Sequence, residues 1–202
     1  MKKGLIALLL IGGGFAVYWF FIRQKPGPSG PPPKPLEITA NTSAFSGSFD
    51  KMLNTYYVLR DAFIKSDAGQ VDIVASQFRY DVDTLNVKEL KADPALVSTA
   101  KSLKESISAE VQAMAKTKDL EGKRRSFQII SDAMYDLVRT VKFDKAMVYQ
   151  IHCPMAFDNA GANWLSNKDE VVNPYFGDKM LHCGEVIDSL DFRPAPAAPA
   201  GQ

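Results

Sequence analysis

The stretch FDKMLNTYYVLRDAF, residues 49–63, carries large apolar side chains at steps of three and four residues. Those side chains fall on one face of a helix: Phe49, Met52, Leu53, Tyr56, Leu59 and Phe63. Such a wide apolar face must be covered by other parts of the protein. The stretch is therefore predicted to be an amphipathic helix that packs against a core.

Three further apolar stripes follow at short polar intervals, in residues 71–85, 94–114 and 127–141. Asp93 and Asp119 precede the last two stripes as helix caps. Four helices with short connections bury their stripes as antiparallel neighbours, so the fold class is predicted to be mainly α, an antiparallel four-helix bundle. Three methionines are assigned to its core: Met52, Met114 and Met134. Three polar side chains are expected to face water: Lys123, Arg124 and Asp132.

Beyond Val141 the pattern changes. Residues 146–153 alternate in a way that is typical of a short strand, and a second strand is expected in 184–190, which together give a small β-hairpin. The connection between them has no long helical or strand period but holds large apolar residues. Long connections that stay ordered in compact domains are usually functional. This C-terminal loop region is therefore predicted to be ordered.

The N-terminal segment has the composition of a membrane span. Residues 4–22 are 19 residues without a charge, which is enough for a helix to cross about 30 Å of hydrocarbon. A cleaved signal peptide is the alternative, but the aromatic run 18–21 stands where small residues of a cleavage site are needed. The prediction is a retained single-pass anchor in the inner membrane, with the domain on the periplasmic side.

Proline-rich sequence separates this segment from the helical region. Residues 26–35 read PGPSGPPPKP, which favours an extended spacer. The predicted organisation is an anchor in 1–25, a linker in 26–47, a domain in 48–192 and a disordered tail in 193–202.

The overall composition excludes some partners. There are 24 basic and 23 acidic side chains, and no long basic run offers a surface for phosphates. Nucleic acid is therefore not expected as a partner. The hydrophobic share of 46% is ordinary for a globular protein.

The residues suited to a chemical site gather near the C-terminus. Cys153 and Met155 lie at one end of the loop region, and Met180 and Cys183 at the other. Thiolate and thioether sulfur prefer Cu(I) and Ag(I), and the four residues are predicted to converge on one ion. A histidine directly precedes each cysteine, so His152 and His182 are further candidate ligands.

A disulfide between Cys153 and Cys183 is the alternative, because such bonds persist in exported domains. It would close a loop of about 30 residues and stabilise the domain by roughly 3–4 kcal/mol, and no metal would then be bound. The neighbouring methionines favour the metal, although methionine also fills gaps in cores. Both alternatives stay open at this point.

Several short motifs in this region carry a resemblance. They are Cys153-Pro154-Met155-Ala156, Gly161-Ala162, Trp164-Leu165-Ser166, Asn173-Pro174-Tyr175-Phe176-Gly177, Met180-Leu181 and Cys183-Gly184. With them the chain resembles, over roughly residues 56–187, the bacterial family called domain of unknown function 3347. Members occur behind a membrane anchor and also appended to periplasmic adaptors of the CusB type, which serve copper and silver efflux. The resemblance implies a metal context and metal-efflux components as partners.

Enzymatic motifs are missing from the sequence. It has no Cys-x-x-Cys, no glycine-rich phosphate loop, no serine elbow and no His-Glu-x-x-His. The function expected is therefore non-enzymatic: an anchored extracytoplasmic protein that binds Cu(I) or Ag(I) as a carrier, sink or efflux accessory. The alternative is a protein-interaction module stabilised by the Cys153–Cys183 disulfide.

Overall fold

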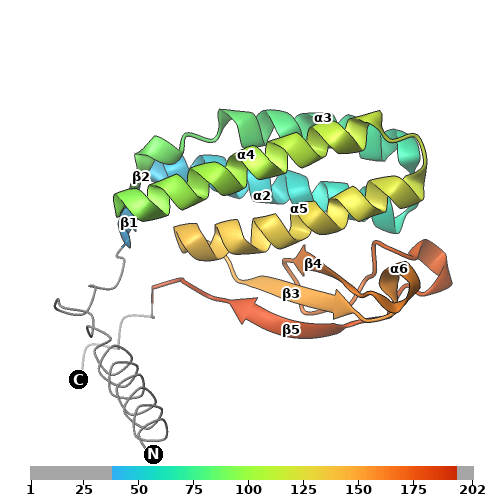
Figure 1. Ribbon diagram of the computed structural model, residues 1–202. Coiled ribbons are helices and arrows are strands. Elements are labelled where there is room, and N and C mark those ends of the chain that lie inside the picture. Colours follow the sequence, from blue (N-terminus) through green and yellow to red (C-terminus); the bar gives the residue numbers. More distant parts are fainter. Residues whose placement is uncertain (1–37, 195–202) are drawn as a thin grey trace, which may run out of the picture. The chain divides into compact units, whose positions relative to one another are not determined.

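The computed structural model describes residues 38–194 (Figure 1). The predicted anchor in 1–25, the part of the predicted linker up to residue 37, and the tail from residue 195 lie outside the described residues. Between residues 38 and 194, none of the helices has the length and apolar character needed to span a bilayer.

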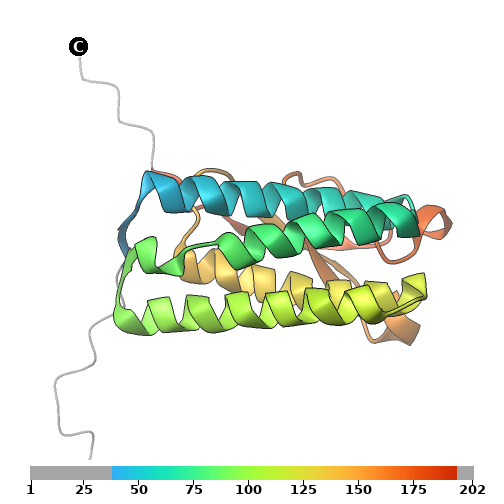
Figure 2. The same ribbon diagram turned by 90° about the horizontal axis from the view of Figure 1, so that it is seen from above.

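Four long helices form most of the described region, and the fold is mainly helical. They are α2 (Ser43–Ile64), α3 (Ala68–Thr84), α4 (Pro94–Lys116) and α5 (Leu120–Val141). Figure 2 shows them lying side by side, and each packs against the next in the chain. The four apolar stripes of the sequence are thus confirmed as helices. Asp119 caps α5 as predicted, since its carboxylate accepts the N–H of Gly122 at 2.7 Å.

The folded region begins before residue 48, where the sequence placed the end of the linker. Strand β1 (Ile38–Asn41) pairs antiparallel with β2 (Leu90–Ala92), which follows the short 3-10 turn η1 (Val87–Glu89). Thr42 then caps α2, because its hydroxyl accepts the N–H of Phe45 at 3.1 Å. The ring of Phe45 is buried, which explains why these residues belong to the domain.

The core lies between the helices and reaches into the region that follows α5. Tyr56, Phe63 and Phe127 pack ring to ring, with the centroid of Phe127 5.3 Å from Tyr56 and 4.8 Å from Phe63. The predicted core methionines are all fully buried: Met52, Met114 and Met134.

The expectation that Lys123, Arg124 and Asp132 face water is wrong. Lys123 is buried and forms an ion pair with Asp72 of α3. The guanidinium of Arg124 donates to the main-chain oxygens of Phe63 and Pro174, so it ties α5 to α2 and to the C-terminal region. Asp132 is half-buried against β4. Helical spacing predicts one apolar face correctly but does not reveal partners that approach the flanks of that face.

A three-stranded antiparallel sheet lies against α5 in place of the predicted two-stranded hairpin (Figure 1). Its central strand β3 (Val148–Cys153) pairs with β4 (Ala162–Ser166) on one side and with β5 (Glu185–Leu190) on the other. The pairing of β3 with β5 confirms the predicted hairpin strands. Strand β4 was missed because most of its side chains are buried, so its sequence ANWLS does not alternate.

Tyr56 fixes the position of β4 relative to the helices. Its buried hydroxyl lies 2.7 Å from the hydroxyl of Ser131 on α5 and accepts the N–H of Leu165 on β4 at 3.0 Å. Burial raises the pKa of Tyr56 to about 12, so the hydroxyl keeps its proton over the physiological range. One side chain therefore connects α2, α5 and the sheet.

The turn between β3 and β4 contains α6 (Ala156–Asn159), which is not a regular helix. Phe157, Asp158 and Asn159 have φ values of 54°, 60° and 66°, so three successive residues are left-handed. Non-glycine residues adopt this conformation only when their surroundings hold them there. Here the ring of Phe157 lies under the guanidinium of Arg125, 4.6 Å from the ring centre, and against the edge of Tyr175.

Candidate functional site

The two cysteines meet at one end of the sheet. Cys153 is the last residue of β3, and Cys183 comes shortly before β5 begins, after the 3-10 turn η2 (Gly177–Lys179). Their Sγ atoms are 2.7 Å apart, and both residues are free thiols. This separation is longer than the ~2.05 Å of a disulfide bond and shorter than the ~3.5–4 Å expected between sulfurs that share a metal ion. The structure therefore brings the predicted pair together as adjacent thiols.

The surroundings of Cys183 favour the protonated form of its thiol. Cys153 is fully buried, whereas Cys183 is half-buried. The hydrogen bond with Cys153 raises the pKa of the Cys183 thiol, and burial and the nearby Cys153 charge act in the same direction. A hydrogen bond from the main-chain N–H of Met155 to the Cys183 sulfur opposes them. A metal ion would have to displace protons here, so its affinity should increase with pH.

The two methionines approach Cys183 through their main chains. Besides the Met155 N–H just described, the carbonyl of Met180 accepts the N–H of Cys183 at 3.2 Å. The side chain of Met155 is 47% exposed, and that of Met180 is half-buried. Both residues thus stand at the cysteine pair, and the contacts recorded for them there are made by main-chain atoms.

His152 is held by a chain of polar side chains that the sequence analysis did not find. Its Nδ1 lies 2.7 Å from Oδ1 of Asn163, its partner across the β3–β4 ladder. The amide nitrogen of Asn163 donates to Asp132 of α5 at 3.0 Å, so the Asn163 oxygen faces the ring and Nδ1 is the donor. In a neutral ring, Nε2 is then left as an acceptor, as a metal ligand requires.

The polar side chains His152, Asn163 and Asp132 are half-buried and closely packed. Burial raises the pKa of Asp132, and the hydrogen bond from Asn163 opposes that rise. The imidazole of His152 lies against Gly161, where a β-carbon would come within 2.7 Å of the ring. A side chain at position 161 would therefore displace the imidazole. Gly161 has a φ of 81°, which also favours glycine.

His182 does not join the cysteine pair. It is exposed, and its Nδ1 donates to the main-chain oxygen of Val171 at 2.9 Å. Within residues 38–194, no group of three or more His, Cys, Asp or Glu side chains is arranged to hold a metal ion. His152 therefore does not form a three-residue group with the two thiols, which fits its place next to Cys153 on β3, since adjacent strand residues point to opposite faces.

The aromatic residues of the region belong to the core. Trp164 and Tyr175 are 1% and 4% exposed and pack edge to face, with their ring centroids 5.9 Å apart. The hydroxyl of Tyr175 donates to the main-chain oxygen of Asn163, and burial raises the pKa of that hydroxyl well above its ordinary value. These contacts join Tyr175 to β4 through Trp164 and Asn163.

Asn163 and Asp132 could not have been found from the sequence. They are 31 positions apart, on a strand that lacks alternation and on a helix flank that reads as solvated. The surroundings of His152 are therefore formed by contacts between a strand and a helix that are distant in sequence, and not by a linear motif.

Comparison with protein families gave one match, to residues 52–146, whereas comparisons with curated proteins and with solved structures gave none. The matched segment runs from α2 to just before β3 and ends ahead of both cysteines. It supports the family suggested by the resemblance, although all of the motifs that suggested it lie beyond the matched residues. Residues 52–146 of this chain match the family described as "Protein of unknown function (DUF3347)".

Proposed function

We propose that the reduced protein binds one monovalent soft metal ion, Cu(I) or Ag(I), through Cys153 and Cys183. The observation that carries the proposal is the pair of free thiols whose sulfurs are 2.7 Å apart. Two thiolates on one monovalent ion match the softness of that ion, whereas Ca²⁺ and Mg²⁺ require oxygen ligands.

Metal binding at this pair requires a small rearrangement. With metal–sulfur bonds of about 2.3 Å, two thiolates on one ion lie roughly 4 Å apart. The thiols must therefore separate by about 1 Å or more. Cys183 lies outside the strands, and Gly184 beside it has a φ of 143°. We assign the movement to Cys183, because Cys153 is fixed within β3 and is fully buried.

The thioethers and His152 complete the proposed ligand set. Met155 is exposed and two residues beyond the end of β3, so its side chain is able to turn toward an ion at Cys183. His152 could add its Nε2 only after a rearrangement, because it does not form a group with the two thiols and its ring lies against Gly161, held there by Asn163 and Asp132. His182 is the least suited of these residues to be a ligand, because its Nδ1 already donates to the main-chain oxygen of Val171.

The physiological role proposed is that of an anchored, extracytoplasmic carrier, sink or efflux accessory for copper or silver, without enzymatic activity. The N-terminal uncharged run and the resemblance to a family found beside copper and silver efflux adaptors support this role. We further propose that α2–α5 form an antiparallel four-helix bundle that serves as the scaffold of the site. The succession of pairwise helix contacts supports that architecture.

The test is an anaerobic competition titration of the reduced full chain against a Cu(I) chelator. We expect one Cu(I) per chain and loss of most of the affinity in Cys183→Ser. The double variant Met155→Leu/Met180→Leu should bind less tightly, whereas Met114→Leu, a core methionine on α4, should not change binding. Asn163→Ala should lower the affinity by about 10- to 100-fold if His152 is a ligand. Absence of Cu(I) binding by the reduced wild-type chain would refute the proposal.

A second function, a protein-interaction module stabilised by a Cys153–Cys183 disulfide, is favoured by the closeness of the two sulfurs and by the burial of Cys153. The intact mass of the chain isolated without reductant separates the two. A mass lower by two hydrogens, together with no Cu(I) uptake after reduction, would favour the disulfide module. An intact mass that corresponds to two free thiols, with the added mass of one copper ion, would favour the metal site.

A further inference from the structure

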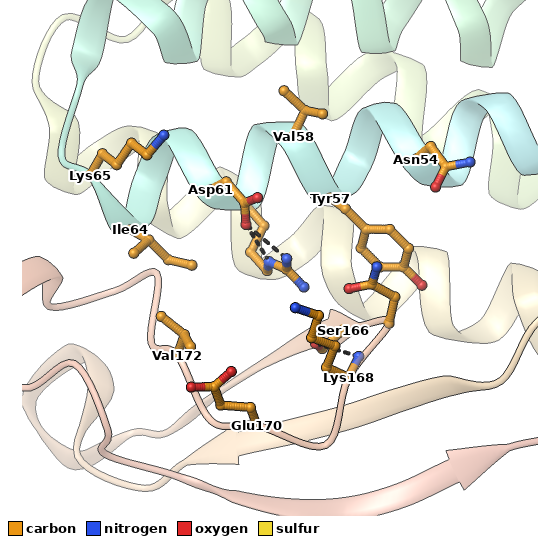
Figure 3. A pocket seen from close by; sticks show the side chains of 12 residues that line it. Asn54, Tyr57, Val58, Asp61, Ile64, Lys65, Ser166, Lys168, Glu170 and Val172 are labelled. Atoms are coloured by element: carbon orange, nitrogen blue, oxygen red, sulfur yellow. Dashed lines mark hydrogen bonds and ion pairs between the residues drawn. The ribbon is translucent and has the colours of Figure 1, made fainter.

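A cleft of about 510 Å³ lies between α2 and the connection that follows β4, away from the cysteine pair (Figure 3). The helix contributes Tyr57, Val58 and Arg60, the end of β4 contributes Ser166, and the connection contributes Lys168. The volume is within the range of sites that hold small organic molecules. The metal-site proposal does not use this cleft, and the inference drawn here is independent of it.

Tyr57 presents an unpartnered hydroxyl to this cleft. The residue is only 8% exposed, and Figure 3 shows its ring extending from α2 toward the connection. Among residues 38–194, no hydrogen bond is recorded for this hydroxyl, whereas the buried hydroxyls of Tyr56 and Tyr175 are both bonded. Burial raises the pKa of Tyr57, so the hydroxyl remains a donor. Among the described residues, the buried side-chain oxygen without a partner is that of Asn41, so the Tyr57 hydroxyl is open to the cleft, where water or a ligand can accept its hydrogen.

Arg60 adds donors in a fixed position. Its Nε and Nη2 donate to Asp61 at 2.9 and 2.7 Å, and its Nη1 donates to the main-chain oxygen of Leu165 at 3.4 Å. A guanidinium has five N–H groups, so two of them remain. The group also lies 5.2 Å from the centre of the Tyr57 ring, which holds it at the cleft.

Ser166 adds a further donor. Its side chain is 4% exposed, and its oxygen accepts the N–H of Lys168 at 3.1 Å. Within the described part of the chain, no acceptor is recorded for its own hydrogen. Donors on two opposing walls thus have unused hydrogens, which makes the cleft complementary to an acceptor such as a carboxylate.

The charges and the apolar walls narrow the class of ligand. Asp61 neutralises Arg60, which leaves Lys65 and Lys168 against Glu170. That balance of about one positive charge suits a monoanion better than a phosphate dianion. Aliphatic side chains form the rest of the lining, namely Val58, Ile64 and Val172. We propose that this cleft binds a small organic monocarboxylate with an apolar body, its carboxylate directed at Tyr57, Arg60 and Ser166.

The test uses benzoate as the probe, with benzamide and benzylamine as neutral and cationic analogues. The ¹⁵N-labelled full chain in dodecyl maltoside is titrated with each and followed by amide chemical shifts. Benzoate should give saturable shifts at residues of the cleft, with a dissociation constant on the order of millimolar for so small a ligand. Benzamide and benzylamine should bind at least about tenfold more weakly, because only benzoate satisfies the charged donors.

Two variants assign the binding to this cleft. Tyr57→Phe keeps the ring and removes the donor, and should weaken benzoate binding about three- to tenfold. Tyr80→Phe, on the exposed face of α3, should leave it unchanged. Lys168→Gln, on the exposed connection, should weaken benzoate binding but not benzamide binding. No saturable shift with benzoate, equal affinity for benzylamine, or an unchanged affinity in Tyr57→Phe would each overturn the proposal.

Discussion

The helices α2–α5 and the sheet region from β3 to β5 are held by different kinds of contact. The helices share a continuous apolar core in which Met52, Phe127 and Met134 are completely buried. In the sheet region, β3 and β4 add buried side chains to the same core, whereas β5 is exposed along most of its length, and specific polar contacts also join the region to the helices. Examples are the bonds of Leu165 to Tyr56 and of Asn163 to Asp132.

Because of this difference, substitutions in the helices and in the sheet region should destabilise the protein in different ways. A shared core distributes its stabilisation over many contacts, so most single changes on its surface are tolerated. The sheet region shares this core through β3 and β4, and its buried hydrogen bonds add a local dependence, because a broken bond leaves a buried group without a partner. We therefore expect the largest losses of stability from core truncation and the most local losses from the polar contacts.

The largest effect should come from Phe127→Ala on α5. The ring is fully buried and packs on Tyr56, Phe63 and Tyr175, so truncation should lower the free energy of unfolding by about 3–5 kcal/mol. Chemical denaturation measures the loss. Ile129→Ala on the same helix, at a 53% exposed position, should change stability by at most about 0.5 kcal/mol. A similar loss in both variants would show that the assigned core face is wrong.

A smaller effect should follow from Tyr56→Phe. The substitution keeps the ring in the core but leaves the N–H of Leu165 without its recorded acceptor, so the loss should be about 1–3 kcal/mol. Denaturation of the variant beside Tyr80→Phe, whose hydroxyl is exposed, provides the comparison. If Tyr56→Phe is as stable as wild type, the hydroxyl does not hold the sheet region in place.

The smallest effect should be seen in how the stability contributions of Asp81 and Asp132 change with pH. Asp81 on α3 is desolvated, yet hydrogen bonds from Lys51, Thr55 and Gln77 lower its pKa overall. Its contribution to stability is therefore present above the ordinary pKa of an aspartate and is lost as the pH falls through the lowered value. Burial raises the pKa of Asp132, so its ionisation should reduce stability as the pH rises from the ordinary value through the raised one.

Urea denaturation of Asp81→Asn and Asp132→Asn between pH 3 and pH 7 should separate the two. Asp81→Asn should lose stability relative to wild type at neutral pH, and that deficit should shrink in acid. Asp132→Asn should gain relative to wild type as the pH rises. Parallel pH curves for both variants would mean that neither carboxyl has the environment described.

The helices could be predicted from the sequence because each repeats its signal over several turns. The six apolar positions from Phe49 to Phe63 all fall on one helical face, so the prediction does not depend on any one of them. Strand β4 has five residues and most of them are buried, so it offers no repeated signal. The β1–β2 pairing joins residues about 50 positions apart, which no local pattern encodes.

The site was predicted in part. Soft ligands at both ends of one connection suggested that Cys153 and Cys183 meet, and the structure places their sulfurs side by side. His152 and His182 were indistinguishable in sequence, since each directly precedes a cysteine. Their different surroundings depend on β4, where Asn163 faces His152, and on the main-chain oxygen of Val171, which binds His182. The direction of a side chain is set by tertiary contacts that residue spacing does not specify.

The bond from Leu165 to Tyr56 also has a consequence for hydrogen exchange. The amide proton of Leu165 is held by a side chain of α2, so it should become exchangeable when β4 separates from the helices. Amides in the middle of α2 require the helix itself to open. The exchange rate of this one strand amide, compared with those in α2, therefore measures how often the sheet region detaches while the helices remain folded.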